Sequence, residues 1–250
     1  MSRTMRLFTK LTVSELRLFL REPAQVFFAL AFPSILIVIL GSIPTFRESS
    51  ADLGGLRVID LYVPIAVALI LAMLALQVTP QVLATYRERG VLRRLATTPA
   101  RPIALLGAQL VLSLLTAIVS GALVLLIGRF AFDVRLPQAL GSFVIAFLLC
   151  AAAVFSLGLF IAAVAPTGKA ANSIGTLLFF PSMFFAGLWT PREVMPRILQ
   201  RIGDFTPLGA GERALHEATT GHWPSLVSLA VLVAYVLVFG AAAARLFKWQ

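Results

Sequence analysis

The sequence predicts an all-α membrane protein, with six transmembrane helices, a helix before the first of them and further short helices between them. Three observations support this fold class. Hydrophobic residues make up 59% of the 250 residues and charged residues only 13%, whereas soluble domains average roughly 45–50% and 25%. The mean hydropathy is +0.94. Long apolar stretches fill most of the chain, and a soluble fold could not cover that much apolar surface.

A helix needs roughly 20 apolar residues to cross ~30 Å of hydrocarbon. The loops between such stretches are too short to fold alone, so residues 1–250 are predicted to form a single transmembrane domain. The six predicted spans are Ala24–Ile43, Asp60–Thr79, Ile103–Gly128, Pro137–Ala165, Ala171–Trp189 and Pro224–Ala244.

Residues 3–22 precede the first span and read as an amphipathic helix. Arg3, Arg6, Lys10 and their neighbours at helical spacing share one face, and apolar side chains lie broadly opposite. This pattern predicts a helix in the cytoplasmic interface, with its basic side chains towards lipid headgroups. Glu15 interrupts the apolar face, so a solvated basic tail is the alternative.

The distribution of charge predicts that both termini are cytoplasmic. With the N-terminus inside, most lysines and arginines fall on the inner side, where the acids are Glu15, Glu22 and Glu88. The whole formal net charge of +10 then lies on that side, as the positive-inside rule requires. Binding of anionic lipid accounts for this charge better than binding of nucleic acid, because the basic residues are spread over several segments.

The loop at 86–98, between the second and third spans, contains a compact basic segment. Leu92 and Leu95 can share one side of a short helix, which prolines following the loop would end. A plain positive-inside anchor is the alternative, but Glu88 favours contact with a partner, because an anchor gains nothing from an acid. The candidate contact residues are Arg87, Glu88, Arg89, Gly90, Leu92, Arg93, Arg94 and Leu95.

Two other segments join predicted spans. Residues 166–169 are short enough to be a simple turn or a lesser contact. Residues 190–223, on the outer side, contain apolar residues at helical spacing and a second helical stretch over Leu208–Ala218. Helices this apolar and this close to the membrane are predicted to dip into it or to cap the bundle.

Several kinds of chemistry are absent from the sequence. It contains no phosphate-binding loop, no nucleophile elbow and no zinc-protease motif. No ionisable residue lies in the middle of a predicted span, which argues against an ion-coupled transporter and against an intramembrane enzyme. His216 and His222 lack further ligand candidates around them. We therefore predict no catalytic residue, no bound cofactor and no metal site.

A few polar residues do lie within the predicted spans. Each can hydrogen-bond a neighbouring helix, or some can line a path for substrate. These residues are Gln77, Gln109, Asn172, Ser173 and Thr176.

Two local motifs resemble ABC-2 type permeases, the membrane subunits of ATP-driven exporters that include the daunorubicin-resistance type. The first is Arg-Glu-Arg-Gly-Val-Leu-Arg-Arg-Leu-Ala-Thr-Thr-Pro at 87–99. The second is the phenylalanine-rich stretch that begins at Phe179, with Gly-Leu-Trp-Thr-Pro at 187–191 and Thr-Pro-Leu at 206–208. The segment at 87–99 is more basic than is usual for this family.

The resemblance implies a bacterial inner-membrane protein, and the excess of arginine over lysine is typical of GC-rich bacterial genomes. Two permease copies or paralogues would form the pathway, each on a separate nucleotide-binding subunit that holds ATP and magnesium. Residues 86–98 would be the coupling helix, and residues 190–223 would form re-entrant helices.

These observations lead to two hypotheses about function. The first is an exporter subunit that moves an apolar or amphipathic substrate, such as a drug, an antibiotic or a lipid. The alternative is an integral-membrane scaffold or membrane enzyme with no motor. Catalytic residues are missing for the enzyme, and a scaffold would be indifferent to changes at Glu88.

Overall fold

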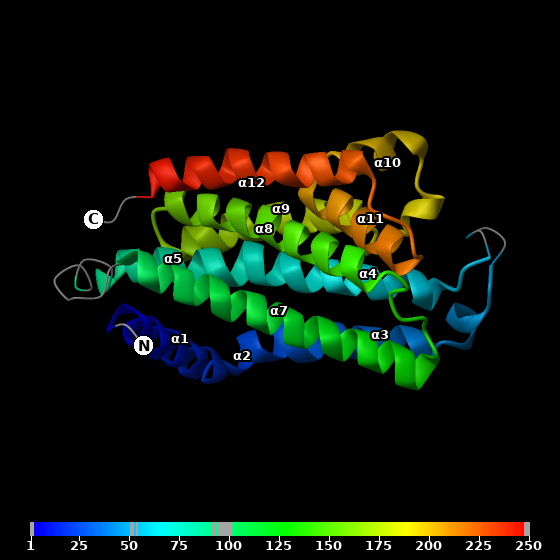
Figure 1. Ribbon diagram of the computed structural model, residues 1–250, viewed down its shortest axis with the longest axis horizontal. Coiled ribbons are helices and arrows are strands. Elements are labelled where there is room, and N and C mark those ends of the chain that lie inside the picture. Colours follow the sequence, from blue (N-terminus) through cyan, green and yellow to red (C-terminus); the bar gives the residue numbers. More distant parts are fainter. Residues whose placement is uncertain (1–2, 51–52, 54, 92–93, 95–101, 248–250) are drawn as a thin grey trace.

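The computed structural model describes residues 3–50, 53, 55–91, 94 and 102–247, and this part of the chain is a bundle of helices without a β-strand. Both termini lie at one end of the bundle, which we call the terminal end (Figure 1). The helices are α1 (Arg3–Leu20), α2 (Pro23–Val26), η1 (Phe27–Ala31), α3 (Phe32–Ser42), η2 (Pro44–Arg47), α4 (Val58–Ala72), η4 (Met73–Val78), α5 (Thr79–Glu88), α7 (Pro102–Phe132), α8 (Leu140–Val164), α9 (Gly168–Phe185), η5 (Arg192–Val194), α10 (Arg197–Asp204), α11 (Pro207–Thr219) and α12 (Leu226–Leu246).

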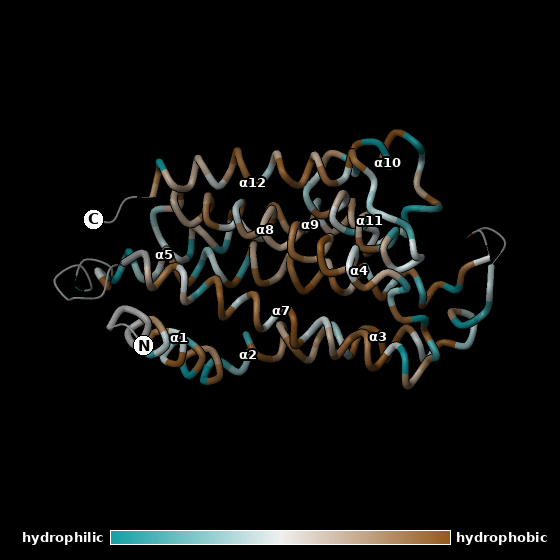
Figure 2. The backbone as a smooth tube through the Cα atoms, in the orientation of Figure 1, coloured by the Kyte–Doolittle hydropathy of each residue, from teal (hydrophilic) through white to brown (hydrophobic). Residues whose placement is uncertain are grey.

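Five helical segments of the described chain are long and apolar enough to cross a membrane: Pro23–Ser42, Val58–Glu88, Ala104–Phe132, Leu140–Val164 and Leu226–Leu246. These segments confirm five of the six predicted spans to within a few residues, except at the end of the second. Apolar residues dominate the middle of the bundle, and polar residues gather at its two ends (Figure 2).

The fifth predicted span, Ala171–Trp189, is not among these segments. The structure forms a helix there, α9, but it begins earlier and ends at Phe185. Lys169, Asn172 and Ser173 lie in its first two turns and lower its apolar character. Composition alone therefore does not make α9 a membrane span.

The central element is the continuous helix formed by α4, η4 and α5. In its most apolar 18-residue stretch, 83% of the residues are buried, whereas in the corresponding stretch of the last span only 17% are buried. Leu69, Ile70 and Leu71 are among its fully buried side chains. α3, α7, α8, α9 and α11 pack against this element, whereas α1 packs on α7 and α12 packs on α8 and α11. The outer faces of these helices supply the apolar surface that lipid or another subunit would cover.

Two π-helices interrupt the spans, and each precedes a proline. Pro33 and Pro80 lack the N–H group that would bond the carbonyls of Ala29 and Leu76, four residues earlier. A local π-turn accommodates the missing bond without ending the helix. The second π-helix, η4, lies inside the central helix.

The segment at 190–223 contains helices, as predicted. α10 exposes Ile198 and Ile202, whereas α11 is largely buried, with Leu208 and Leu215 at 0% exposure. Both lie at the end of the bundle away from the termini, which we call the far end (Figure 1).

Candidate functional site

The last residues of α5 hold the turn between α8 and α9. The Arg87 guanidinium donates to the carbonyl of Ala163, at 3.0 Å, and to that of Ala165. The Glu88 carboxylate accepts a bond from the N–H of Gly168, at 2.9 Å. A cation at the C-terminus of α8 and an anion at the N-terminus of α9 both complement the helix dipoles. This clasp, formed by Arg87 and Glu88 on the 163–168 turn, therefore fixes where α8 ends and where α9 begins.

The start of α9 also lies directly against α5. A Cβ on Gly168 would overlap the hydroxyl of Thr85 and would lie 3.3 Å from the carbonyl of Gln81. The Thr167 side chain accepts from the N–H of Ala170, at 3.1 Å, and so caps the helix. Glycine at 168 thus permits the close approach that the clasp requires.

The prediction of a separate helix over 86–98 is wrong at its start, because Tyr86–Glu88 are the last residues of α5. The central helix extends to Glu88, beyond the predicted span Asp60–Thr79. A run of apolar residues predicts only the apolar part of a helix, so its polar continuation was missed. Gly90, with φ +67°, follows the end of α5.

Beyond α5, Arg89 is exposed and its carbonyl accepts a bond from the Arg94 guanidinium at 2.9 Å. Arg94 N–H also donates to the carbonyl of Gly90, at 3.1 Å. Leu92, Arg93 and Leu95 lie outside the described residues, as do residues 96–98, so the rest of the predicted helix stays a prediction.

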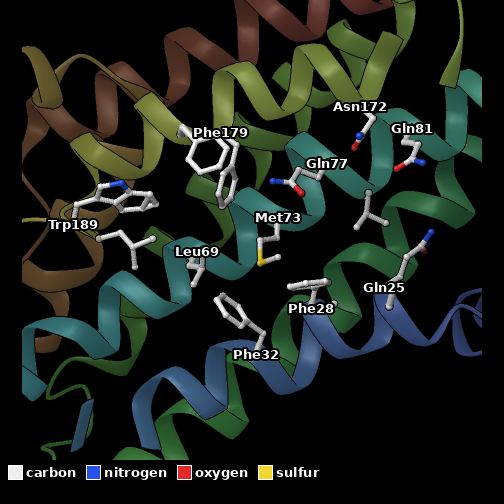
Figure 3. Close-up of a pocket in the computed structure, with 15 residues that line it drawn as sticks. Gln25, Phe28, Phe32, Leu69, Met73, Gln77, Gln81, Asn172, Phe179 and Trp189 are labelled. Atoms are coloured by element: carbon white, nitrogen blue, oxygen red, sulfur yellow. The ribbon is translucent and has the colours of Figure 1, made fainter. Parts of the chain in front are cut away.

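A cavity of about 400 Å³ lies between the first span, the central helix and α9 (Figure 3). Gln25, Gln81 and Asn172 lie towards one end of the close-up and Trp189 towards the other. Most of the wall is apolar, so the cavity can hold an apolar body and has amide groups at one end. Its lining residues are Ala24, Gln25, Phe28, Ala29, Phe32, Leu69, Met73, Gln77, Val78, Gln81, Asn172, Phe179, Phe180, Leu188 and Trp189.

The structure brings two of the five predicted polar residues, Gln77 and Asn172, to this cavity. Gln109 is 4% exposed and lines a different pocket, beside α1. The Ser173 hydroxyl donates to the carbonyl of Lys169 within its own helix, at 3.1 Å. Thr176 is half-buried and is not among the cavity-lining residues.

The central helix is irregular where it borders the cavity, because Met73, Gln77 and Val78 belong to η4. A Cβ on Gly175 of α9 would overlap the carbonyl oxygen of Leu76, the carbonyl that Pro80 leaves without its usual donor. On the other side, a Cβ on Gly158 of α8 would overlap the carbonyl oxygen of Ala75. Both neighbouring helices thus approach this π-turn at a glycine.

Glu15 is a residue whose role the sequence did not reveal. It is 5% exposed, and the hydroxyl of Tyr86 donates to its two oxygens at 3.1 and 2.9 Å. Burial raises the pKa of Glu15, and the bond from Tyr86 acts in the opposite direction. An acid within the otherwise apolar face of residues 3–22 was the sequence signal for this contact. In the structure, the bond between Glu15 and Tyr86 links α1 to α5.

A second cluster of charges that sequence reasoning missed holds the far end. Asp204 pairs with Arg192 at 2.6 Å and with Arg213 at 3.0 Å, and Arg213 also pairs with Glu217 at 2.9 Å. Close by in sequence, Glu212 is 6% exposed, and burial raises its pKa to about 8. The cluster joins α10 to α11 before the chain enters α12.

No group of three or more His, Cys, Asp or Glu side chains that could hold a metal ion occurs in the described ranges. Nδ1 of His222 lies 3.2 Å from the hydroxyl of Thr220. Both oxygens of the Glu15 carboxylate, and one oxygen of the Glu88 carboxylate, accept hydrogen bonds from groups within this chain.

The sequence profile of the ABC-2 type transporter family matches residues 6–218. The chain belongs to this family. This ABC-2 permease is similar to the inner membrane transport permease YhhJ of Escherichia coli (strain K12), with 27% identity over 133 residues. It is equally similar to the permease of the same name from Shigella flexneri, again 27% identical over 133 residues.

The alignment covers 53% of this permease and 36% of each relative's own length. The family resemblance indicated by the 87–99 and 179–208 motifs is therefore confirmed. Family membership, together with the apolar helices, makes the chain a multi-pass membrane protein of the ABC-2 type transporter family.

Proposed function

We propose that this permease is the membrane subunit of an ATP-driven exporter, with a separate nucleotide-binding subunit as its motor. The clasp is the observation that carries this proposal, because it links the basic segment after α5 to the first turn of α9. The sequence has no phosphate-binding loop. ATP and Mg²⁺ would therefore be held by the partner subunit.

The clasp supports a route for movement from the motor to the cavity. A partner that displaces Arg89 and the residues after it also displaces Glu88, and with it the start of α9 at Gly168. Asn172 follows one turn later and lines the cavity, as does Phe179 further along the same helix. Because a helix moves as a stiff rod, a small shift at the clasp would move a whole cavity wall.

We propose six crossings with both termini in the cytoplasm, so that the terminal end of the bundle is the inner one. α9 supplies the crossing that composition misses, since it starts at the Glu88–Gly168 bond near one end of the central helix. Beyond its last turn, the Leu188 carbonyl accepts a bond from Tyr62 near the other end of that helix, at 3.2 Å. α1 would then lie in the inner interface, and α10 and α11 would form the re-entrant pair.

An apolar or amphipathic substrate suits the cavity. Its wall contains five aromatic rings, among them Phe28, Phe179 and Trp189, and its polar groups are uncharged amides. About 400 Å³ lies at the lower end of the range for drug-sized sites. A second permease copy facing the same groove would complete the pathway.

The test is recovery of the motor. The full chain, purified from its native membrane in mild detergent, should retain a subunit with a phosphate-binding loop and vanadate-sensitive ATPase activity. Arg89→Glu, at the exposed residue next to the clasp, should reduce that recovery, whereas Arg201→Glu on exposed α10 should not. Recovery of no ATPase would instead favour a scaffold without a motor, and equal recovery from both variants would show that the motor does not bind at Arg89.

A further inference from the structure

A second pocket, of about 470 Å³, lies between α1, α5 and α7 and is more polar than the cavity. It shares Gln25 and Gln81 with the cavity, so the two spaces adjoin at these amides. Its lining residues are Glu15, Leu18, Phe19, Arg21, Glu22, Gln25, Gln81, Val82, Thr85, Tyr86, Arg89, Gln109 and Leu112.

The most buried charged group in this pocket is the carboxylate of Glu15, at 5% exposure. None of the ion pairs of the described residues includes it. Its two oxygens share the single hydroxyl proton of Tyr86, although a carboxylate can accept about four hydrogen bonds. A buried acid with spare acceptor capacity is stabilised when a cation enters beside it.

Two other polar groups of the pocket favour the same occupant, and two exposed arginines oppose it. Gln109, at 4% exposure, adds an amide to the pocket wall. Glu22 is exposed at the rim and adds a second acid. Arg21 and Arg89 are also exposed lining residues, where water screens their charge more than that of Glu15.

We propose that this pocket binds the ammonium group of an amphiphile whose apolar part occupies the adjoining cavity. The inference deepens the proposed export function, on which it rests, by naming the substrate class. Glu15 holds the ammonium, Gln25 and Gln81 lie at the junction, and the chain or ring system extends towards Trp189 (Figure 3). Leu69 and Gln81 both line the cavity and lie twelve residues apart on the central helix, so the apolar part can extend about 18 Å.

Tryptophan quenching tests the site without any motor or transport. Trp223→Phe and Trp249→Phe would leave Trp189 as the only tryptophan. The probes are hexadecylammonium, whose N–H groups can donate to a carboxylate, with bromine near the end of the chain, and a brominated hexadecyl maltoside as its uncharged equivalent. The ammonium probe should reach half-quenching at about tenfold lower concentration, as one charge-assisted contact predicts.

Glu15→Gln should abolish this preference while keeping an acceptor for Tyr86. Tyr86→Phe should retain it, because the carboxylate remains. Glu48→Gln, an exposed acid in the far-end loop, should leave it unchanged. Equal quenching by both probes, a preference that survives in Glu15→Gln, or a loss in Tyr86→Phe as well would each overturn the proposal.

The same measurement separates two sources of the ammonium group. In phosphatidylglycerol bilayers, adding phosphatidylethanolamine should weaken quenching by the ammonium probe if the membrane's own amino lipid occupies the site. Unchanged quenching would identify a free amphiphile as the occupant. Because ATP takes no part, the site can be supported even where no motor is recovered, and it can fail even where export is observed.

Discussion

Replacement of Glu88 by lysine tests the clasp most directly. The carboxylate accepts the Gly168 N–H in the first turn of α9, and lysine removes this acceptor and places a cation at the helix N-terminus. A charge-assisted hydrogen bond contributes about 1.5–3 kcal/mol where it is buried, and about 1 kcal/mol where the group is exposed, as here. The unfavourable dipole term adds roughly 0.3–1 kcal/mol.

The expected destabilisation by Glu88→Lys is therefore about 2 kcal/mol, which lowers Tm by about 4–8 °C for a chain of this size. Such a loss is small beside the apolar burial of the bundle, so the protein should still insert and fold. ATP-driven substrate uptake into inverted membrane vesicles should be lost, because the proposed motor subunit would no longer move α9. ATP hydrolysis by the assembled complex should continue without transport.

Two variants calibrate this result. Glu88→Gln keeps an acceptor for Gly168 and should lower Tm by less than half as much, with partial transport. Glu48→Lys makes the same charge change at an exposed position of the far-end loop and should have no effect. Normal uptake and an unchanged Tm in Glu88→Lys would refute the argument that this residue links the basic segment after α5 to α9.

Three further predictions concern packing and charge elsewhere in the bundle. Gly175→Ala places a methyl group on the carbonyl of Leu76 and should cost about 3 kcal/mol or more in thermal unfolding, whereas Gly121→Ala, with open space around it, should cost nothing. Glu212 ionises near its ordinary pKa in the unfolded chain, whereas burial raises its pKa to about 8 in the folded protein. The free energy of unfolding should therefore fall as pH rises from about 5 to 8. Glu212→Gln should flatten that profile, and a profile unchanged by the substitution would contradict it. Asp204→Ala leaves two arginines without their shared carboxylate and should speed tryptic cleavage in α10, with a loss of about 2 kcal/mol.

The sequence alone was sufficient to predict the fold class, five spans, the helices of 190–223 and the family. These follow from hydropathy, spacing and local motifs, which are properties of the linear chain. The charge distribution also predicts the orientation of the chain in the membrane, which stays a prediction. The candidate residues Gln77 and Asn172 were chosen only because they are polar within apolar stretches, and both line the cavity.

Tertiary contacts decided the rest. α9 carries too many polar residues to qualify as a span by composition. Its first residue, Gly168, and Leu188, just beyond its end, nevertheless bond near the two ends of the central helix. Glu88 looked like a group that faces a partner, because the sequence could not indicate that a backbone N–H eighty residues later lies beside it. Glu15 looked like a flaw in an amphipathic face. Only the packing of α1 on α7 and the hydrogen bond from Tyr86 of α5 make it a buried acid beside a pocket.

The composition of the chain determined the environment that it needs. Long runs of apolar residues favour lipid, regardless of which side chains they contact in the folded protein. What only the folded bundle decided is which polar groups meet, because hydrogen bonds depend on distances of about 3 Å between residues that are far apart in the sequence.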